Sequence, residues 1–251
     1  MLDVVGAAAS RGRFNSRLPA TSSAESEAAP TGIFLSVTGL IGSMGVGQAQ
    51  NKGLMKNKYL ILIVSAVLVI PLLYFFDVPI WQAARDLVEP DYLYIPDFFT
   101  HYGLYLFYLV FGAIATYAFN KKDRSLIAFT LAYIKTQLIF SLVVVRLLKV
   151  LLGRPRPGKG FEFTFLATSF SHNAFPSGHA TDAFVSGVFL FYLLNQSKYS
   201  GYRFLPLIYA FLIAASRVFV SSHYPSDVAA GMAIATMGAW FFISRLERLP
   251  E

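Results

Sequence analysis

The stretch "YLILIVSAVLVIPLLYFF", residues 59–76, decides the fold class. It is an almost unbroken apolar run, and a membrane-spanning helix needs about 20 mostly apolar residues. The whole chain has a matching composition, because 55% of its 251 residues are hydrophobic and only 14% are charged. Soluble domains have roughly a quarter charged residues. Run length and composition together predict a protein embedded in a membrane.

Further apolar runs of spanning length follow the first one. They cover residues 102–119, 126–145, 180–194, 204–220 and 228–244. Pro71 and Pro206 fall inside two of the runs, which a helix bundle tolerates because neighbouring groups satisfy the freed carbonyls. The predicted fold class is therefore all-α, a polytopic bundle of six transmembrane helices.

The first part of the chain differs from the rest. Residues 10–32, "SRGRFNSRLPATSSAESEAAPTG", are small and polar, and the weakly apolar run after them is short and rich in glycine. This composition predicts a disordered extension over residues 1–57 ahead of a six-helix domain over residues 58–251. Because "MKNKYLILIVSAV" from Met55 is an ordinary start for a bacterial membrane protein, we also expect that the upstream start is mis-assigned, which N-terminal sequencing checks.

Lysine and arginine predict the orientation of the bundle. With a cytoplasmic N-terminus, the first outer loop, residues 77–101, has Arg85 as its only lysine or arginine, against five acidic residues. The inner segments then have ten basic residues: Lys52, Lys56, Lys58, Lys121, Lys122, Arg124, Lys198, Arg203, Arg245 and Arg248. This asymmetry follows the positive-inside rule and predicts that both termini are cytoplasmic. The basic segment "KVLLGRPRPGKG", residues 149–160, is an exception on the outer side and needs its own reason.

Three clusters of polar residues fall on that outer side. The first has Lys149, Arg156 and Pro157; the second is "PSGH", residues 176–179; the third is "SRVFVSSHYPSD", residues 216–227. The orientation was assigned from other residues, so the shared side is an independent check. We expect the three clusters to form one site at the outer face of the membrane.

The side chains in these clusters suit a phosphate group. Two arginines and a lysine offer forked donors and a point charge for phosphate oxygens. Ser177 adds a hydroxyl, and the amides around Gly178 lie at a helix start, which favours an anion. Two histidines allow one ring to attack phosphorus while the other protonates the leaving oxygen. Asp227 is placed to hold the tautomer of His223.

The three clusters resemble signature motifs of a known family. "K-x6-RP" at residues 149–157, "PSGH" at 176–179 and "SR-x5-H-x3-D" at 216–227 are similar to the three motifs of the type 2 phosphatidic acid phosphatase superfamily. All three are complete and in order. The resemblance covers residues 149–227, and the six-helix layout with its motifs on the outer side is also similar to the membrane members. It does not cover residues 1–57.

The resemblance implies a role for each matching residue. His223 corresponds to the nucleophile that forms a phosphohistidine, oriented by Asp227. His179 corresponds to the general acid for the leaving alkoxide and then to the base that activates water. The phosphate-binding set corresponds to Lys149, Arg156, Ser177, Gly178 and Arg217. No metal or other cofactor is expected. The sequence has no cysteine, which excludes a thiol nucleophile and a cysteine-ligated metal.

Four polar residues near the motifs or within a span need separate interpretation. Arg154 and His172 are possible substrate contacts, although both also suit plain loop positions. Asp182 lies one turn after His179 and is expected to be a local structural partner. Lys135 lies in the middle of a predicted span, where charges are costly and functional by default. Its distance from the outer end argues against a catalytic part.

The site predicts a lipid phosphatase of the bacterial inner membrane. The expected partners are the bilayer and a lipid phosphate, such as phosphatidic acid, phosphatidylglycerophosphate, undecaprenyl diphosphate or a lipid A phosphate; nucleic acid is not expected. A phosphotransferase on the same site is an alternative. A vanadate-dependent haloperoxidase has a similar anion pocket, but the predicted spans count against it. A non-catalytic protein that binds or transports an anionic lipid is the third alternative.

Overall fold

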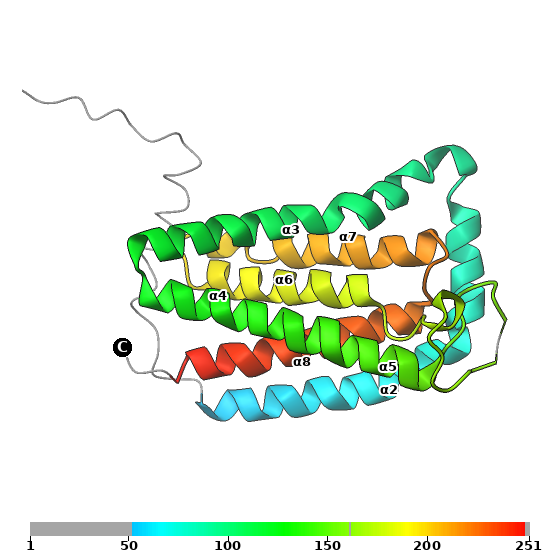
Figure 1. The fold of residues 1–251 in the computed structure, drawn as a ribbon, viewed down its shortest axis with the longest axis horizontal. Helices are drawn as coiled ribbons and strands as arrows, with labels where there is room; N and C mark the ends of the chain where they lie inside the picture. Colours follow the sequence, from blue (N-terminus) through cyan, green and yellow to red (C-terminus); the bar gives the residue numbers. More distant parts are fainter. Residues whose placement is uncertain (1–51, 161, 249–251) are drawn as a thin grey trace, which may run out of the picture.

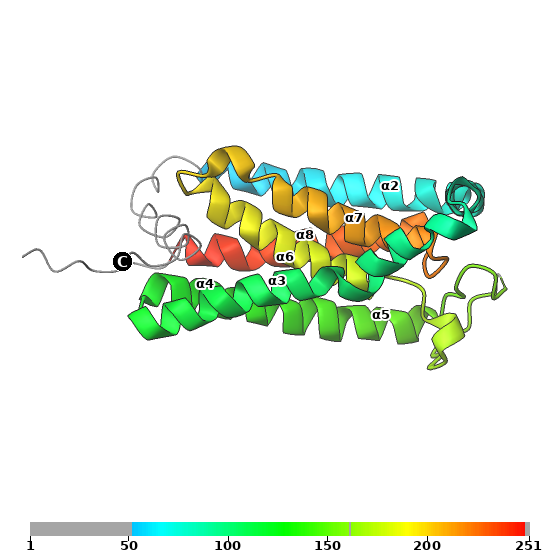
Figure 2. The same ribbon diagram turned by 90° about the horizontal axis from the view of Figure 1, so that it is seen from above.

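Helix α6 (Gly178–Asn195) lies at the centre of a bundle of long helices, as the two views in Figures 1 and 2 show. The computed structural model describes residues 52–160 and 162–248, and these contain no β-strand. The other long helices are α2 (Lys52–Leu87), α3 (Tyr94–Lys121), α4 (Arg124–Thr136), α5 (Val145–Leu152), α7 (Leu205–Phe219) and α8 (Pro225–Leu246). The short helical turns are η1 (Pro90–Tyr92), η3 (Phe170–His172) and η4 (Ser200–Tyr202).

One continuous rod joins α4 to α5. Asp123 begins it by accepting the amide of Leu126 at 3.0 Å, which satisfies one unpaired donor at the helix start. A π-helical stretch, η2 (Gln137–Val144), lies in its middle. Ser141 in this stretch donates a hydrogen bond to the carboxylate of Asp182 on α6. Asp182 therefore has a structural hydrogen bond to a neighbouring helix, which agrees with the structural role expected for it.

Five helical segments are long and apolar enough to cross a membrane in the described part of the chain. They are Val64–Leu87, Pro90–Lys121, Arg124–Leu152, Ser200–Phe219 and Pro225–Leu246. The predicted all-helical membrane class is confirmed, but the predicted count of six is not. The difference lies in α6, which corresponds to the predicted run 180–194. Polar residues at both its ends lower its hydropathy, and protein rather than lipid surrounds most of it.

Helix α2 is longer than the apolar run that predicted it. It continues past Asp77 and Pro79 to Leu87, so much of the predicted outer loop is helical. Figure 1 shows that its last part turns and runs across one end of the bundle. α2 contains Pro71 and Pro79, and each lacks the amide that would bond to the preceding turn of the helix. α2 begins at Lys52, within the predicted extension 1–57, the rest of which lies outside the described residues.

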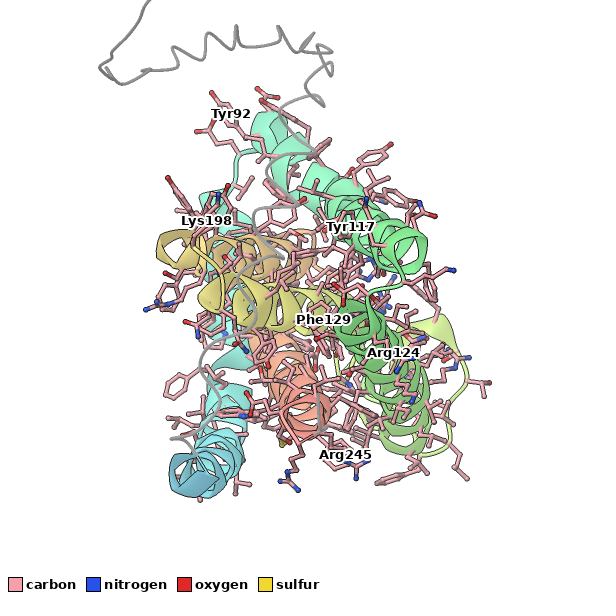
Figure 3. All side chains as sticks on the ribbon, turned by 90° about the vertical axis from the view of Figure 1, so that its left-hand side faces the viewer. Tyr92, Tyr117, Arg124, Phe129, Lys198 and Arg245 are labelled. Atoms are coloured by element: carbon pink, nitrogen blue, oxygen red, sulfur yellow. The ribbon has the colours of Figure 1, made fainter. Side chains whose placement is uncertain are left out.

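The main apolar core lies between α3, α4, α6 and α8. Phe111 of α3 stacks on Tyr133 of α4 with ring centroids 3.5 Å apart, and Phe189 of α6 meets Phe129 edge to face at 5.4 Å. Phe129 points into the bundle in Figure 3. These rings bury large apolar surfaces, so they fix how α6 sits against its neighbours.

Basic residues gather at one end of the bundle. Figure 3 looks at this end and shows Arg124, Lys198 and Arg245 on three different segments. They belong to the ten basic residues that predict the cytoplasmic side. Lys135 is exposed on α4, beside the exposed apolar side chains of Ile134 and Leu138. It therefore lies on the surface of the bundle rather than in its interior.

Candidate active site

The three sequence clusters meet at the other end of the bundle. Helices α5 and α7 end there, and α6 and α8 begin there, as Figures 1 and 2 show. The amide of Ser177 donates to the carbonyl of Asp227 at 2.9 Å, which ties the start of α6 to the start of α8. The amide of Ala174 donates to the carbonyl of Arg154 at 3.0 Å, which ties the loop before α6 to the segment after α5.

A glycine lets α8 approach the start of α6. A Cβ atom on Gly231 would lie 2.5 Å from the carbonyl oxygen of Ser177 and 3.2 Å from the Cβ of Ala180. Carbon and oxygen atoms do not normally come closer than about 3.3 Å. A residue with a Cβ at position 231 would therefore push the start of α6, with the second cluster, away from α8, with the end of the third cluster.

His223 and Asp227 lie next to one another in the interior of this end. His223 is 2% exposed and Asp227 is fully buried. The Nδ1 atom of His223 lies 3.6 Å from Oδ2 of Asp227, which is close but longer than a hydrogen bond. The same Oδ2 accepts the amide of Tyr224 at 2.8 Å, at the start of α8. Asp227 thus lies close to His223, as predicted, but the two side chains are not hydrogen-bonded.

Nearby cations act on the ring of His223. Burial, together with the positive charges of Lys149 and Arg217, holds the pKa of His223 well below its ordinary value. Burial and like charges both disfavour the imidazolium form. These effects favour the neutral form of the ring, in which one nitrogen has a lone pair.

Asn173 organises two of the predicted phosphate ligands. The ammonium of Lys149 donates to the backbone carbonyl of Asn173. The Nη2 of Arg156 donates to its side-chain oxygen at 3.0 Å, and the guanidinium lies 3.7 Å from the ring centroid of Phe170. Asn173 was not predicted as a site residue. Its only signal in the sequence is its place three residues before the "PSGH" segment.

Three polar atoms in this region have no protein partner. In the described part of the chain, the buried side-chain atoms without a hydrogen bond are Ser177 Oγ, Arg217 Nε, His223 Nδ1 and Gln137 Oε1. The first three belong to predicted site residues. Buried polar groups normally have partners, so Ser177 Oγ and Arg217 Nε, which lie beside cations, fit an anionic ligand, whereas His223 Nδ1 faces Oδ2 of Asp227 at 3.6 Å. Gln137 belongs to the separate cluster around Asp182.

Gly178 and His179 form the first turn of α6. Both are half-buried. Ser177 is the N-cap residue of this helix, and its side chain makes no capping bond. The first amides of α6 thus point toward the same end as the cations, which favours a negative charge there. Ser216, which precedes Arg217, is held by the hydroxyl of Thr100 at 2.8 Å.

Arg154 has a different environment from the one predicted. Arg154 is 5% exposed, and its guanidinium lies between the carboxylates of Asp77 and Asp227, each 2.6 Å away. It was predicted as a possible substrate contact, but its guanidinium is already bonded to acids in the interior. Asp77 and Ser226, which complete this arrangement, were not predicted at all. No sequence signal pairs residues that are so far apart in the chain.

His172 lies in η3 within the loop between α5 and α6. It is half-buried, and its Nδ1 lies 3.0 Å from the hydroxyl of Ser171. The carbonyl of Ser171 accepts the amide of Arg156 at 2.9 Å, so this part of the loop is attached to the site. The described residues contain no cluster of three or more histidines and acids arranged to hold a metal ion.

An apolar groove opens beside the site. It has a volume of about 480 Å³ and lies between the end of α2, the start of α3 and α7. Leu87, Phe99, Leu212 and Ala215 line it. Ser216, next to Arg217, forms part of its wall. The wall of the groove thus includes the residue that precedes Arg217 in the sequence.

The fold and the site together define an integral membrane protein, all-helical where it is described, with a cationic, histidine-containing site at one end. Residues 130–250 match the PAP2 superfamily model, so the chain carries a PAP2 superfamily domain. This match confirms the resemblance drawn from the three motifs.

Similar proteins agree with this assignment. Lipid A 1-phosphatases of Rhizobium etli and Rhizobium johnstonii are each 35% identical over 143 residues, which is 53% of this chain. The aligned part spans 58% and 55% of these two relatives, little more than half their length. The crystal structure of a transmembrane PAP2 type phosphatidylglycerolphosphate phosphatase from Bacillus subtilis superposes with a TM-score of 0.58 at 21% identity. The superposition covers 77% of this chain and 98% of the Bacillus subtilis chain, and it supports the fold.

Proposed function

We propose that this protein is a membrane lipid phosphatase that transfers the phosphoryl group of its substrate to His223 and then to water. The observation that carries the proposal is the pair of orphaned polar atoms of Ser177 and Arg217 close to the ring of His223, with Lys149 and Arg156 nearby. These groups suit a phosphate with its phosphorus facing the neutral ring of His223.

The reaction needs two histidines with different roles. His223 attacks phosphorus through its lone pair, and the bond between phosphorus and the leaving oxygen breaks. His179 donates a proton to that oxygen and then accepts one from the water that attacks the phosphohistidine. The cations and the amides of α6 stabilise the charge on the phosphoryl oxygens in both steps. Asp227 stabilises the positive charge that develops on His223. These roles require no metal ion.

The position of the site favours a lipid as substrate. The apolar groove beside Ser216 is suited to an acyl chain, while the cationic cluster is suited to the phosphate at the membrane surface. The basic residues at the opposite end favour a cytoplasmic location for that end and for both termini. The site then faces the outside of the membrane, which we infer to be the inner membrane of a bacterium. The relatives make the 1-phosphate of lipid A the first substrate to test.

The decisive experiment measures phosphate release by the purified protein in detergent with EDTA. The substrates are lipid A 1-phosphate, phosphatidic acid, phosphatidylglycerophosphate and undecaprenyl diphosphate. We expect release from at least one of them, and product analysis separates hydrolysis from transfer to an acceptor hydroxyl. No release from any substrate, or release only with a divalent metal, contradicts the proposal.

Variants separate catalysis from binding. His223→Ala and His179→Ala should abolish release while the thermal unfolding curve stays as in the parent protein. His101→Ala is the matched control, because His101 is an exposed histidine at the same end that bonds the carbonyl of Asp97 at 3.0 Å. A His223→Ala protein that still releases phosphate would contradict the role of His223 as nucleophile. A parent protein that binds these lipids without releasing phosphate would point to a non-catalytic lipid-binding protein.

A further inference from the structure

A buried set of charges connects α2 with His223. At its centre, Nη1 of Arg154 lies 2.6 Å from Oδ1 of Asp227, and Nη2 lies 2.6 Å from Oδ2 of Asp77. The hydroxyl of Ser226 accepts from Nη1 of Arg154 at 2.7 Å and donates to Oδ2 of Asp77. The four side chains of this set, Asp77, Arg154, Ser226 and Asp227, are at most 5% exposed. A set this deeply buried persists only when every charge in it is paired.

Asp77 comes from a helix outside the matched domain. The PAP2 superfamily match covers residues 130–250, whereas Asp77 lies on α2, two residues before Pro79. Its Oδ1 accepts the amide of Ser226 at 2.8 Å, at the first turn of α8. Helix α2 is therefore attached to the start of the helix that carries Asp227.

The geometry of Asp227 depends on this set. Arg154 holds its Oδ1, and the amide of Tyr224 holds its Oδ2 at 2.8 Å, so both oxygens have fixed positions. Oδ2 is also the oxygen that lies 3.6 Å from Nδ1 of His223. The charged or titratable groups around this carboxylate are Arg154, Asp77, His223, Tyr224 and Lys149. A buried carboxylate without its guanidinium would take up a proton rather than stay charged.

We propose that Asp77 and Arg154 are positioning residues for His223. Arg154 keeps the Asp227 carboxylate ionised and oriented, and Asp77 holds the second arm of the guanidinium so that its first arm stays on Asp227. In this way an acid of the first helix controls the ring that attacks phosphorus, so the inference rests on the proposed function. Neither residue touches the substrate.

The activity test uses Asp77→Asn and Arg154→Ala. A displaced Asp227 should lower kcat by about 10- to 100-fold, because small misplacements of reacting groups are that costly. KM should stay the same, since the phosphate ligands are untouched. Arg85→Ala and Asp86→Asn are the matched controls, because they form an exposed pair on the same helix, 3.5 Å apart. They should leave kcat unchanged.

Guanidinium ion offers a rescue that a merely structural role would not show. A second groove of about 300 Å³, lined by Tyr74, Phe75 and Leu152, reaches the side chain of Arg154. Low millimolar guanidinium chloride should therefore restore part of the kcat of Arg154→Ala. Potassium chloride at the same ionic strength should not, and His223→Ala should not respond to either salt.

A measurement without turnover keeps the inference separate from the proposed function. Nitrogen-15 NMR of histidine-labelled protein reports the tautomer of His223, assigned by the signals lost in His223→Ala. We expect one tautomer with a proton on Nδ1 in the parent protein and a changed tautomer or mixture in Asp77→Asn and Arg154→Ala. Unchanged signals in both variants overturn the inference, even if no lipid is hydrolysed. Unchanged kcat in an active protein, or a loss of kcat that follows only lost stability without guanidinium rescue, overturns it as well.

Discussion

The contact between α6 and α8 at Gly231 yields a sharp prediction. In Gly231→Ala the new Cβ would lie 2.5 Å from the carbonyl oxygen of Ser177 and 3.0 Å from Oγ1 of Thr181. Carbon and oxygen atoms need about 3.3 Å, so the two helices must separate by about 0.8 Å. This movement changes the distance between the start of α6, with His179, and the start of α8, with Asp227. Overpacking of this kind costs about 1–3 kcal/mol of stability.

The assay for Gly231→Ala combines phosphate release with thermal unfolding in the same detergent. We expect a fall of about 10- to 100-fold in kcat, because a displacement near 1 Å of reacting groups has that effect. Gly112→Ala is the matched control, since a Cβ on Gly112 of α3 meets nothing within 4 Å. It should unfold at the same or a higher temperature and keep its kcat. A Gly231→Ala protein with full kcat and full stability refutes the geometry given for the site.

Three other predictions concern pH, the groove and the loop. The kcat/KM profile should have an acid limb, where His223 takes up a proton, and a basic limb, where His179 loses one. Both limbs should lie below the ordinary histidine range, because burial and nearby cations lower the pKa of both rings; an acid limb above pH 7 contradicts this. Ala215→Trp should fill the apolar groove and lower kcat/KM for long-chain phosphatidic acid but not for a short-chain analogue; equal effects on both count against an acyl-chain site. Gly153→Ala should lower the unfolding temperature, because φ is +53° and the Cβ would lie 1.6 Å from the carbonyl of Thr164; Gly158→Ala, with nothing within 4 Å, should lower it less.

The sequence predicts the long helices well because lipid imposes a simple rule on them. The apolar runs correspond to α2, α3, the rod from α4 to α5, and α6 to α8. The rule fails at two places for physical reasons. An apolar run does not reveal a helical segment that lies across the end of the bundle, such as residues 77–87 of α2. The mean hydropathy of α6 is also low, because the polar residues at its two ends lie in the site and beside loops rather than in lipid.

In the site, too, residues within short motifs could be predicted from the sequence, whereas contacts between distant segments could not. His179, His223, Lys149 and Arg217 stand out because their chemistry and spacing are visible in short segments. The partners of Arg154 could not be predicted, because Asp77 approaches it only through the turn in α2. A basic residue in an outer loop suits both a substrate contact and an ion pair. Burial decides between them, and burial depends on the assembled bundle.

The enclosed position of α6 has a consequence for how the protein enters the membrane. A segment partitions alone into lipid when its own apolar side chains outweigh its polar ones. Helix α6 has a histidine and an aspartate among its first five residues and is covered by other helices, so we expect it to insert poorly by itself. Its stable insertion then requires α7 and α8, which are synthesised after it. Helix α6 should thus be the last to settle in the bilayer, and a truncated chain that ends before α7 should leave it in water.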